Sequence, residues 1–380
     1  MSASNLNDPA RSGEVHPTVS APGEADDDDL LAHDSGDAAA PSSATADAAA
    51  EVECRHAEVD AAGHGERLDR WLVRVAPEFS RSHLQGLIEA GHVRCGAQVL
   101  TSASKKVSAG QAIDITLWPT AQSTAFRPEP MALAIVYEDA HLLVINKPAG
   151  LVVHPAAGHW SGTLMNGLLA HHAAAAQLPR AGIVHRLDKD TSGLMLVAKS
   201  LVAHTALVRA IAAREVRREY LALVHGEVGE QTEVIDAPIG RDPVSRIKMA
   251  VVASGKPART DVTGLACIDL SEPRSIGTQA PHRRVSAVHC RLHSGRTHQI
   301  RVHMALRHHP LLADAVYGGA ALLGVQRQAL HAARLSLRHP VTDAPLRLEA
   351  PLPADLMAAW EQVTGSAQMV WPASHYNLAA

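Results

Sequence analysis

Apolar residues acquire a helical period near residue 66, which marks the start of the first folded segment. One predicted helix face follows the i, i+3, i+4, i+7 spacing and comprises Leu68, Trp71, Leu72 and Val75. A second helix is predicted from an N-cap at Ser80 to a stop signal at Gly91. Its buried face comprises Leu84, Leu87 and Ile88. Short β segments then complete a small αα-β domain, predicted over residues 64–120.

Beyond residue 131 the apolar runs are short and strand-like, and helical patterns interrupt them at irregular intervals. The predicted strands are Ala134–Tyr137, Leu142–Asn146, Leu194–Ala198, Glu219–His225, Ile247–Val252 and Ser286–Leu292. The predicted helices are Thr163–His172, Leu201–Arg214 and Thr297–His309. Because strands dominate, the pattern favours an α+β fold with a mixed or antiparallel central sheet over a doubly wound one.

Three segments lack apolar periodicity and are predicted to lie outside the two domains. Residues 1–60 are rich in Ala, Asp, Ser and Gly, which is typical of a disordered tail. Residues 121–130 contain two prolines and are predicted to form a linker. The larger domain is then expected to span residues 131–365, followed by a C-terminal tail at 366–380.

Charge is distributed unevenly along the 380 residues. Residues 1–50 carry ten acidic residues and one base, a net charge of −9. Since the whole chain carries −4, the remainder carries +5. A mildly basic body is compatible with a polyanionic partner such as nucleic acid, although charge alone does not establish one.

Composition argues against several classes of protein. The four cysteines form no C-x-x-C pair and the 24 histidines form no H-E-x-x-H motif, so neither a disulfide framework nor a metal site is predicted. No apolar stretch approaches the ~20 residues needed to cross a bilayer, and the first residues lack a secretory signal pattern. We therefore expect a cytoplasmic protein with no membrane contact and no bound metal.

The densest group of polar residues is enclosed by apolar runs between Gly182 and Ser200. Ile183 and Val184 lead into a polar stretch that contains His185, Arg186, Asp188, Lys189 and Asp190. The apolar run Leu194–Ala198 follows it. Polar residues between two apolar strands tend to lie in a loop that a rigid sheet positions, where catalytic groups are common. Asp188 is the strongest candidate.

Two further segments could complete a site with the segment that contains Asp188. They are Arg217-Arg218-Glu219-Tyr220 and the run from Ser294 to His303, a Ser-Gly turn that leads into a helix on which Arg301 shares a face with Thr297 and His298. A carboxylate near an arginine tends to remain ionised, which suits a nucleophile or base rather than a general acid. Residue types alone leave alternatives open: a glycosidase with Asp190 as second carboxylate, or a structural ion pair between Asp188 and Arg301. A two-metal nuclease would need more acids than these segments offer.

The small domain resembles the S4-like RNA-binding domain. The resemblance rests on Arg67-Leu68-Asp69, on Ser80-Arg81-Ser82 and on the apolar positions through Val93. Where that family has Asn-Gly followed by a basic residue, this chain has Cys95-Gly96. The resemblance implies RNA contacts from basic residues off the apolar face, namely Arg67, Arg70, Arg81, Lys105 and Lys106.

The larger domain resembles the RluA family of RNA pseudouridine synthases. The run Gly182–Lys199 matches the family signature without a gap, and further matches are Asn146–Pro155, Arg218-Glu219-Tyr220, Gly255–Ala258, Gly295–His303 and Asp314–Gly319. With the S4-like domain, the resemblance covers about residues 64–360. It implies isomerisation of uridine to pseudouridine, without cofactor or metal.

The resemblance also implies roles for individual residues. Asp188 matches the catalytic aspartate, Tyr220 the aromatic residue stacked on the target base, and Arg301 the arginine paired with the aspartate. The Tyr220 ring could also help to deprotonate C5 of the base. Arg186 matches the residue that fills the gap left by the flipped nucleotide, and Ile300 would pack beside the base. Further expected substrate contacts are His185, for which a structural hydrogen bond is equally open, Arg296, His298 and Gln299.

The expected partner is structured ribosomal RNA of the large subunit, bound by a monomer. The group within the family that this chain matches implies the helix 69 hairpin as the target. Two separated basic patches could hold a folded stem-loop, because RNA hairpins are recognised through shape, phosphates and splayed bases. The second patch is expected from Arg241, Arg246, Lys248 and Lys256. A non-catalytic ribosome-assembly factor and an N-glycosidic hydrolase that uses the same aspartate remain alternatives.

Overall fold

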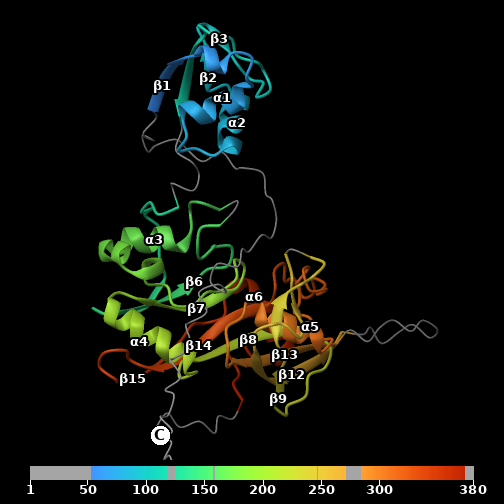
Figure 1. Cartoon of the computed structure of the whole chain (residues 1–380). Coiled ribbons are helices and arrows are strands. Elements are labelled where there is room, and N and C mark those ends of the chain that lie inside the picture. Colours follow the sequence, from blue (N-terminus) through green and yellow to red (C-terminus); the bar gives the residue numbers. More distant parts are fainter. Residues whose placement is uncertain (1–52, 118–124, 157–158, 246, 271–283, 373–380) are drawn as a thin grey trace, which may run out of the picture.

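The computed structural model describes residues 53–117, 125–156, 159–245, 247–270 and 284–372. It contains two domains, a small N-terminal one and a larger one built on a long twisted sheet (Figure 1). The first 52 residues of the expected tail lie outside the described residues.

The small domain packs two helices against a four-stranded sheet. Its helices are α1 (Leu68–Val75) and α2 (Arg81–Glu89), with a 3-10 turn at Ala61–Gly63. Its strands are β1 (Glu53–Glu58), β2 (Val93–Cys95), β3 (Gln98–Val99) and β4 (Ala112–Leu117), in the order β1-β4-β2-β3. β1 pairs with β4 along its whole length, so residues 53–60 belong to the domain, and the prediction of a tail up to residue 60 was wrong there. Apolar periodicity could not reveal β1 because its residues are mostly polar and none of them is buried.

The predicted helix faces of the small domain are confirmed. Leu68, Leu72, Leu84 and Ile88 are completely buried and form one core with residues of β4. The Ser80 hydroxyl accepts a hydrogen bond from the amide of His83, as an N-cap does, and a left-handed Gly91 follows α2.

The larger domain contains a nine-stranded sheet, mostly antiparallel, in the order β5-β6-β7-β14-β8-β13-β12-β9, with β15 paired to β14. Its strands are β5 (Ile135–Glu138), β6 (Leu142–Lys147), β7 (Ser192–Ala198), β8 (Arg217–His225), β9 (Glu233–Asp236), β12 (Arg259–Asp269), β13 (Arg284–Leu292), β14 (Leu330–Arg338) and β15 (Pro345–Glu349). β10 (Ile239–Arg241) and β11 (Met249–Val251) form a separate hairpin. Only β7 and β14 pair in parallel, which confirms the predicted mixed sheet for the described residues.

Helices cover both faces of this sheet. The helices are α3 (Leu164–His171), α4 (Leu201–Ala212), α5 (Gln299–Leu306) and α6 (Ala354–Thr364). Two 3-10 helices, Ala173–Gln177 and Pro179–Gly182, follow α3. One core joins α3 and α5 to the face that carries Tyr220, whereas α4 and α6 pack on the opposite face in two other cores.

The expected strands and helices of this domain are present, with ends shifted by a few residues. The strands β12 and β14 were not predicted, because polar residues interrupt their apolar pattern. In β14, His331 and Arg334 are buried, and they are satisfied by Ser192 and Glu349 from other elements. Their burial therefore depends on partners that are remote in sequence.

Parts of the expected linker and C-terminal tail are packed on the larger domain. The side-chain amide of Asn166 in α3 donates to the carbonyls of Ala125 and Arg127. Trp371 lies under the guanidinium of Arg334, 3.4 Å from the ring centre, and packs edge-on against His289. These residues of the predicted linker and tail therefore contact the larger domain.

Two glycines permit the close packing of the segment that contains Asp188. Gly193 has φ +118°, and a Cβ there would lie 2.2 Å from the carbonyl oxygen of Ala332 in β14. Gly182 has φ +84°, and a Cβ there would meet the carbonyl oxygen of Ala198 at 2.0 Å. Because other residues are strained at positive φ and would clash here, glycine is required at both ends of the segment.

Candidate functional site

Asp188 lies in the loop that enters β7, where several contacts fix the backbone. The amide of Thr191 donates to the carbonyl of Asp188, and Ile183 pairs with Val197 of β7. The completely buried ammonium of Lys147 donates to the carbonyls of Pro148, Leu151 and Lys189 at 2.8, 3.0 and 2.8 Å. Lys147 therefore ties the loop after β6 to the loop that carries Asp188.

Arg301 of α5 is held between two carboxylates. Its Nε and Nη2 donate to Asp314 at 2.8 and 2.9 Å, and its Nη1 donates to Oδ2 of Asp188 at 3.1 Å. Burial alone would lower the pKa of Arg301, but Asp314 and Asp188 outweigh it and raise this pKa. Asp314 thus fixes the guanidinium in a bidentate pair through Nε and Nη2, and Nη1 donates to Asp188.

The Asp188 carboxylate keeps one oxygen available. No described residue donates a hydrogen bond to Oδ1, whereas Oδ2 accepts from Arg301. The side chain of Asp188 is 13 % exposed and lines a pocket. An ionised carboxylate aimed by one arginine, with one free oxygen facing a pocket, can act as a nucleophile or a base.

The pocket joins the three segments that the sequence singled out. Tyr220 of β8 and Ile300 of α5 line it with Asp188, and both are almost fully buried. Burial, reinforced by the charge of Asp188, raises the pKa of Tyr220 to about 12, although Arg218 opposes this shift. Burial therefore favours the neutral phenol, which suits stacking on a base.

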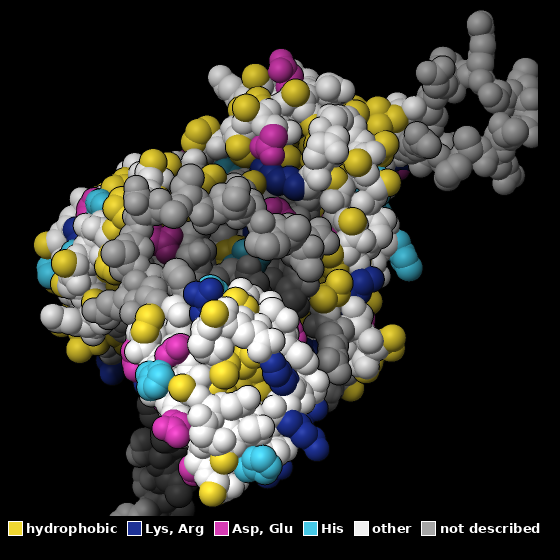
Figure 2. Space-filling view, turned by 90° about the horizontal axis from the view of Figure 1, so that it is seen from above, with side chains coloured by type: hydrophobic (Ala, Val, Ile, Leu, Met, Phe, Trp, Pro, Cys, Tyr) yellow, Lys and Arg dark blue, Asp and Glu magenta, His cyan; other side chains and the backbone are white. Residues whose placement is uncertain are grey.

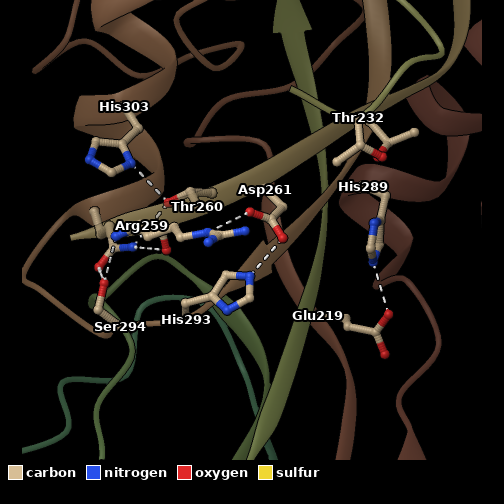
Figure 3. Close-up of polar contacts among 11 residues, drawn as sticks. Glu219, Thr232, Arg259, Thr260, Asp261, His289, His293, Ser294 and His303 are labelled. Atoms are coloured by element: carbon tan, nitrogen blue, oxygen red, sulfur yellow. Dashed lines mark hydrogen bonds and ion pairs between the residues drawn. The ribbon is translucent and has the colours of Figure 1, made fainter. Parts of the chain in front are cut away.

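The turn before α5 is held to β12 by Gln299. Its side-chain oxygen accepts from the Ser294 hydroxyl and the Arg296 amide, and its nitrogen donates to the Arg259 carbonyl and the Thr260 hydroxyl. Thr260 also forms a hydrogen bond with His303 of α5, which Figure 3 shows as a dashed line. Gln299 lines the pocket, but its amide is already saturated, so its role is to position the turn.

The helix that carries Arg301 begins later than the sequence predicted. α5 starts at Gln299, and His298 before it is left-handed with φ +56°. Thr297 and His298 therefore do not share a helical face with Arg301, although both line the pocket. The amide of Met249 donates to the Tyr317 hydroxyl, which also forms a hydrogen bond of 2.8 Å with Nδ1 of His298.

His185 lies behind the pocket. Its Nε2 accepts a hydrogen bond from the amide of Leu196 in β7 at 2.9 Å, and its side chain is not among the pocket-lining ones. Burial, followed by the positive charge of Arg218, lowers the pKa of His185 to about 3. The geometry supports a structural role for His185, whereas Arg186 and Arg296 do line the pocket and are half-buried.

The basic residues of the small domain are organised around a buried acid. Asp69 is completely buried and accepts hydrogen bonds from Arg67, Arg81 and Gln85. These bonds lower the pKa of Asp69, with Arg67 contributing most. The side chains of Arg67 and Arg81 remain 47 % and 52 % exposed, so Asp69 holds two accessible guanidinium groups side by side.

The other expected RNA contacts of the small domain are accessible to different degrees. Lys106 is exposed and pairs through its backbone with Arg67, whereas Lys105 is half-buried. Arg70 of α1 pairs with Glu66, which precedes that helix. Figure 2 looks down on this domain and shows several Lys and Arg side chains along one edge.

The second expected patch lies on one hairpin. Arg241 ends β10, Lys248 immediately precedes β11, and the backbone of Lys256 pairs with Ile239. Arg246 lies outside the described residues. Ile239, Met249 and Val302 form a small core, so this hairpin packs against α5.

Several site residues were not assigned by sequence reasoning. Asp314, Tyr317, Arg218 and Lys147 all fall within or beside the matched motifs, but no role was derived for them. The signal in the sequence was Asp314 itself, an acidic residue of a matched motif to which no role had been given. Which acid meets Arg301 could only be learned from the fold.

The described residues include neither a metal-binding cluster nor a membrane-spanning helix. Within them, no group of three or more His, Cys, Asp or Glu side chains is arranged to hold a metal ion. No helix in the same ranges is long and apolar enough to cross a membrane.

Comparison with known proteins agrees with this geometry. Residues 141–306 match the RNA pseudouridylate synthase family, and residues 66–113 match the S4 domain. The chain is 48% identical over 305 residues to ribosomal large subunit pseudouridine synthase D of Neisseria meningitidis, covering 77% of each protein. It is 45% identical over 307 residues to the protein of that name from Nitrosomonas europaea, covering 79% of this chain and 85% of the relative. A relative of the same name in Pasteurella multocida is 41% identical over 326 residues, covering 82% of this chain and 96% of the relative.

Each of these relatives matches more than three quarters of the chain, and the family match over residues 141–306 includes Asp188, Tyr220 and Arg301. The protein is an enzyme: it belongs to the RluA-type RNA pseudouridine synthases and carries an S4 domain in front of the catalytic domain.

Proposed function

We propose that this enzyme converts specific uridines to pseudouridine in large-subunit ribosomal RNA, with Asp188 as the catalytic residue. One observation carries the proposal. In a chain 48% identical to a ribosomal large subunit pseudouridine synthase D, Asp188 faces the pocket with one oxygen bonded to Arg301 and the other unengaged.

The residues that line the pocket support a reaction in which the uracil is detached from the ribose and then rejoined to it. The bond between C1′ and N1 breaks, the uracil turns, and a new bond joins C1′ to C5, while C5 loses a proton and N1 gains one. Asp188 acts at C1′ or as the base, Tyr220 stacks on the flipped uracil, and Ile300 packs beside it. Arg301 aims the carboxylate, and Arg186 at the pocket edge fills the place that the base has left, since extraction costs a few kcal/mol.

The RNA target and the residues that bind it are proposed as follows. The target is the helix 69 hairpin, held by Arg67, Arg81 and Lys106 of the S4 domain and by the hairpin that carries Arg241 and Lys248. Lys105, Arg70, Arg246 and Lys256 extend these two patches. Because the two patches belong to different domains, they suit a folded stem-loop rather than a single strand. The enzyme works as a cytoplasmic monomer without cofactor or metal.

The experiment is pseudouridine mapping in ribosomal RNA from cells that contain or lack this protein, followed by reconstitution with purified enzyme and large-subunit RNA transcripts. Loss of specific pseudouridines from the 23S RNA, restored by wild type and not by Asp188→Asn, is expected. Asp190→Asn is the matched control, because Asp190 is two residues away and does not line the pocket. An active Asp188→Asn would overturn the catalytic assignment.

Product analysis separates the remaining alternatives. An N-glycosidic hydrolase would release free uracil and leave an abasic site, whereas isomerisation retains the base in the polymer. A non-catalytic assembly factor would bind the transcript without changing it. Either result with the wild-type enzyme would refute the proposed reaction.

A further inference from the structure

A second buried arginine lies in the pocket and has no acid beside it. Arg218 of β8 is 4 % exposed, lines the pocket, and points to the same side of the strand as Tyr220, two residues further on. Among the described residues it forms no ion pair with any carboxylate, and its Nε lacks a hydrogen-bond partner. Burial lowers the pKa of Arg218, but a guanidinium remains protonated near pH 7.

Arg218 therefore differs from Arg301, although both guanidinium groups share one pocket. Arg301 pairs with two carboxylates, those of Asp188 and Asp314. The groups next to Arg218 are neutral, because His185 has a pKa of about 3 and Tyr220 one of about 12. No carboxylate of the described residues therefore pairs with this cation.

An uncompensated buried charge is costly, and a site keeps one where a ligand supplies the opposite charge. Other polar atoms of the pocket show the same need. The buried hydroxyls of Thr191 and Thr297 both line the pocket and have no hydrogen-bond partner among the described residues. The substrate itself must therefore supply polar atoms at this depth.

The reaction provides a suitable anion. When the bond between C1′ and N1 breaks, the electron pair stays on the uracil ring and spreads onto its carbonyl oxygens. A phosphate of the target nucleotide is the other candidate, but the backbone stays near the pocket mouth, whereas Arg218 is buried beside the ring that stacks on the base. The position of Arg218 favours the base.

We propose that Arg218 is a second catalytic residue, whose guanidinium donates to a carbonyl oxygen of the flipped uracil and stabilises the negative charge that develops there. This inference rests on the proposed function. Arg218 keeps its proton throughout, so the atoms and electrons balance as in the isomerisation itself. Donors aimed at a developing oxyanion typically contribute about 10²–10³ in rate.

Gly295 provides an independent means of displacing this guanidinium. A Cβ at Gly295 would lie 2.6 Å from Nη1 of Arg218, which is the flexible end of that side chain. Gly295→Ala should therefore push the guanidinium aside without altering its charge or the strand that carries it.

The test measures single-turnover rates and RNA dissociation constants of the full-length enzyme on a large-subunit RNA transcript. Arg218→Gln is expected to slow the reaction by about 10²-fold or more, with a dissociation constant within about threefold of wild type. Arg218→Lys should recover part of the rate, and Gly295→Ala should slow it in the same way. Arg217→Gln, on the opposite face of β8, is the matched control and should react at the wild-type rate.

Thermal unfolding distinguishes catalysis from a structural role. The burial of the Arg218 charge is unfavourable, because no partner among the described residues offsets it, so Arg218→Met should keep or raise the melting temperature. If Arg218 had a structural role, this variant would have a lower melting temperature. The inference would be overturned by an unchanged rate in Arg218→Gln, whether or not the dissociation constant for RNA rises. A wild-type enzyme that makes no pseudouridine would instead refute the proposed function itself.

Discussion

Asp314→Asn tests whether the second carboxylate fixes Arg301 for catalysis. Asp314 is 1 % exposed and binds Arg301 through two hydrogen bonds of 2.8 and 2.9 Å. The asparagine keeps the size of the side chain but removes its charge. Arg301 should then turn toward the remaining carboxylate, Asp188, and engage both of its oxygens.

The magnitude follows from the burial of this pair. At about 4 Å and an effective dielectric constant of about 20, the lost attraction is roughly 4 kcal/mol. Removing the buried charge of Asp314 also removes its desolvation cost, which offsets part of the lost attraction, and Asp188 still pairs with Arg301. A loss of about 2–3 kcal/mol in unfolding free energy is therefore expected. For a domain of this size, that corresponds to a melting temperature lower by about 4–12 °C. Pseudouridine formation should fall by about 10²-fold or more, since Asp188 loses its free oxygen.

The assay pairs thermal unfolding with single-turnover pseudouridine formation. Asp343→Asn is the matched control, because Arg338 and Asp343 form an equally short two-bond pair on the surface, with both side chains more than half exposed. That variant should leave the melting temperature and the rate unchanged. If Asp314→Asn reacts at the wild-type rate, the view that Asp314 aims Arg301 is refuted.

Three further perturbations probe other contacts. Lys147→Met should lower the unfolding free energy by about 3–5 kcal/mol in urea titrations, because three buried carbonyls lose their donor; a stable variant would contradict this. Asp69→Asn should weaken RNA binding in filter assays, because two arginines lose their anchor, whereas the exposed Asp114→Asn should not; equal affinities would refute it. Since burial lowers the pKa of His185 to about 3, only the unfolded chain protonates it below pH 6.5, so unfolding free energy should fall by about 1.4 kcal/mol per pH unit from pH 6.5 toward 4.5. His185→Gln should remove that part of the slope, and an unchanged slope would contradict the assignment.

The sequence predicted the elements whose burial is decided locally. The faces of α1 and α2 and the strands β6, β7 and β8 carry apolar residues at the period of their own structure, so hydrophobic pattern was enough. The strand β14 was missed, because His331 and Arg334 become buried only through partners on other elements. The strand β1 was missed because its order depends on pairing with β4, about 60 residues away in sequence.

The candidate site divides in the same way. Asp188, Tyr220 and Arg301 were singled out from three separate sequence motifs, and the structure places them at one pocket. Whether Asp188 meets Arg301 is a matter of two side chains 113 positions apart, and the 3.1 Å contact between them exists only in the folded chain.

By itself, the sequence determined the order of the two domains, the local helices and strands with a clear apolar period, and the motif around Asp188. Only the tertiary structure decided how charge is shared in the pocket. There, Asp314 takes most of the hydrogen bonds of Arg301, His185 turns away to the backbone of β7, and Arg218 is left as a buried cation. The physical reason is that the energy of a charge depends on its distance to partners and on burial, and a linear sequence specifies neither.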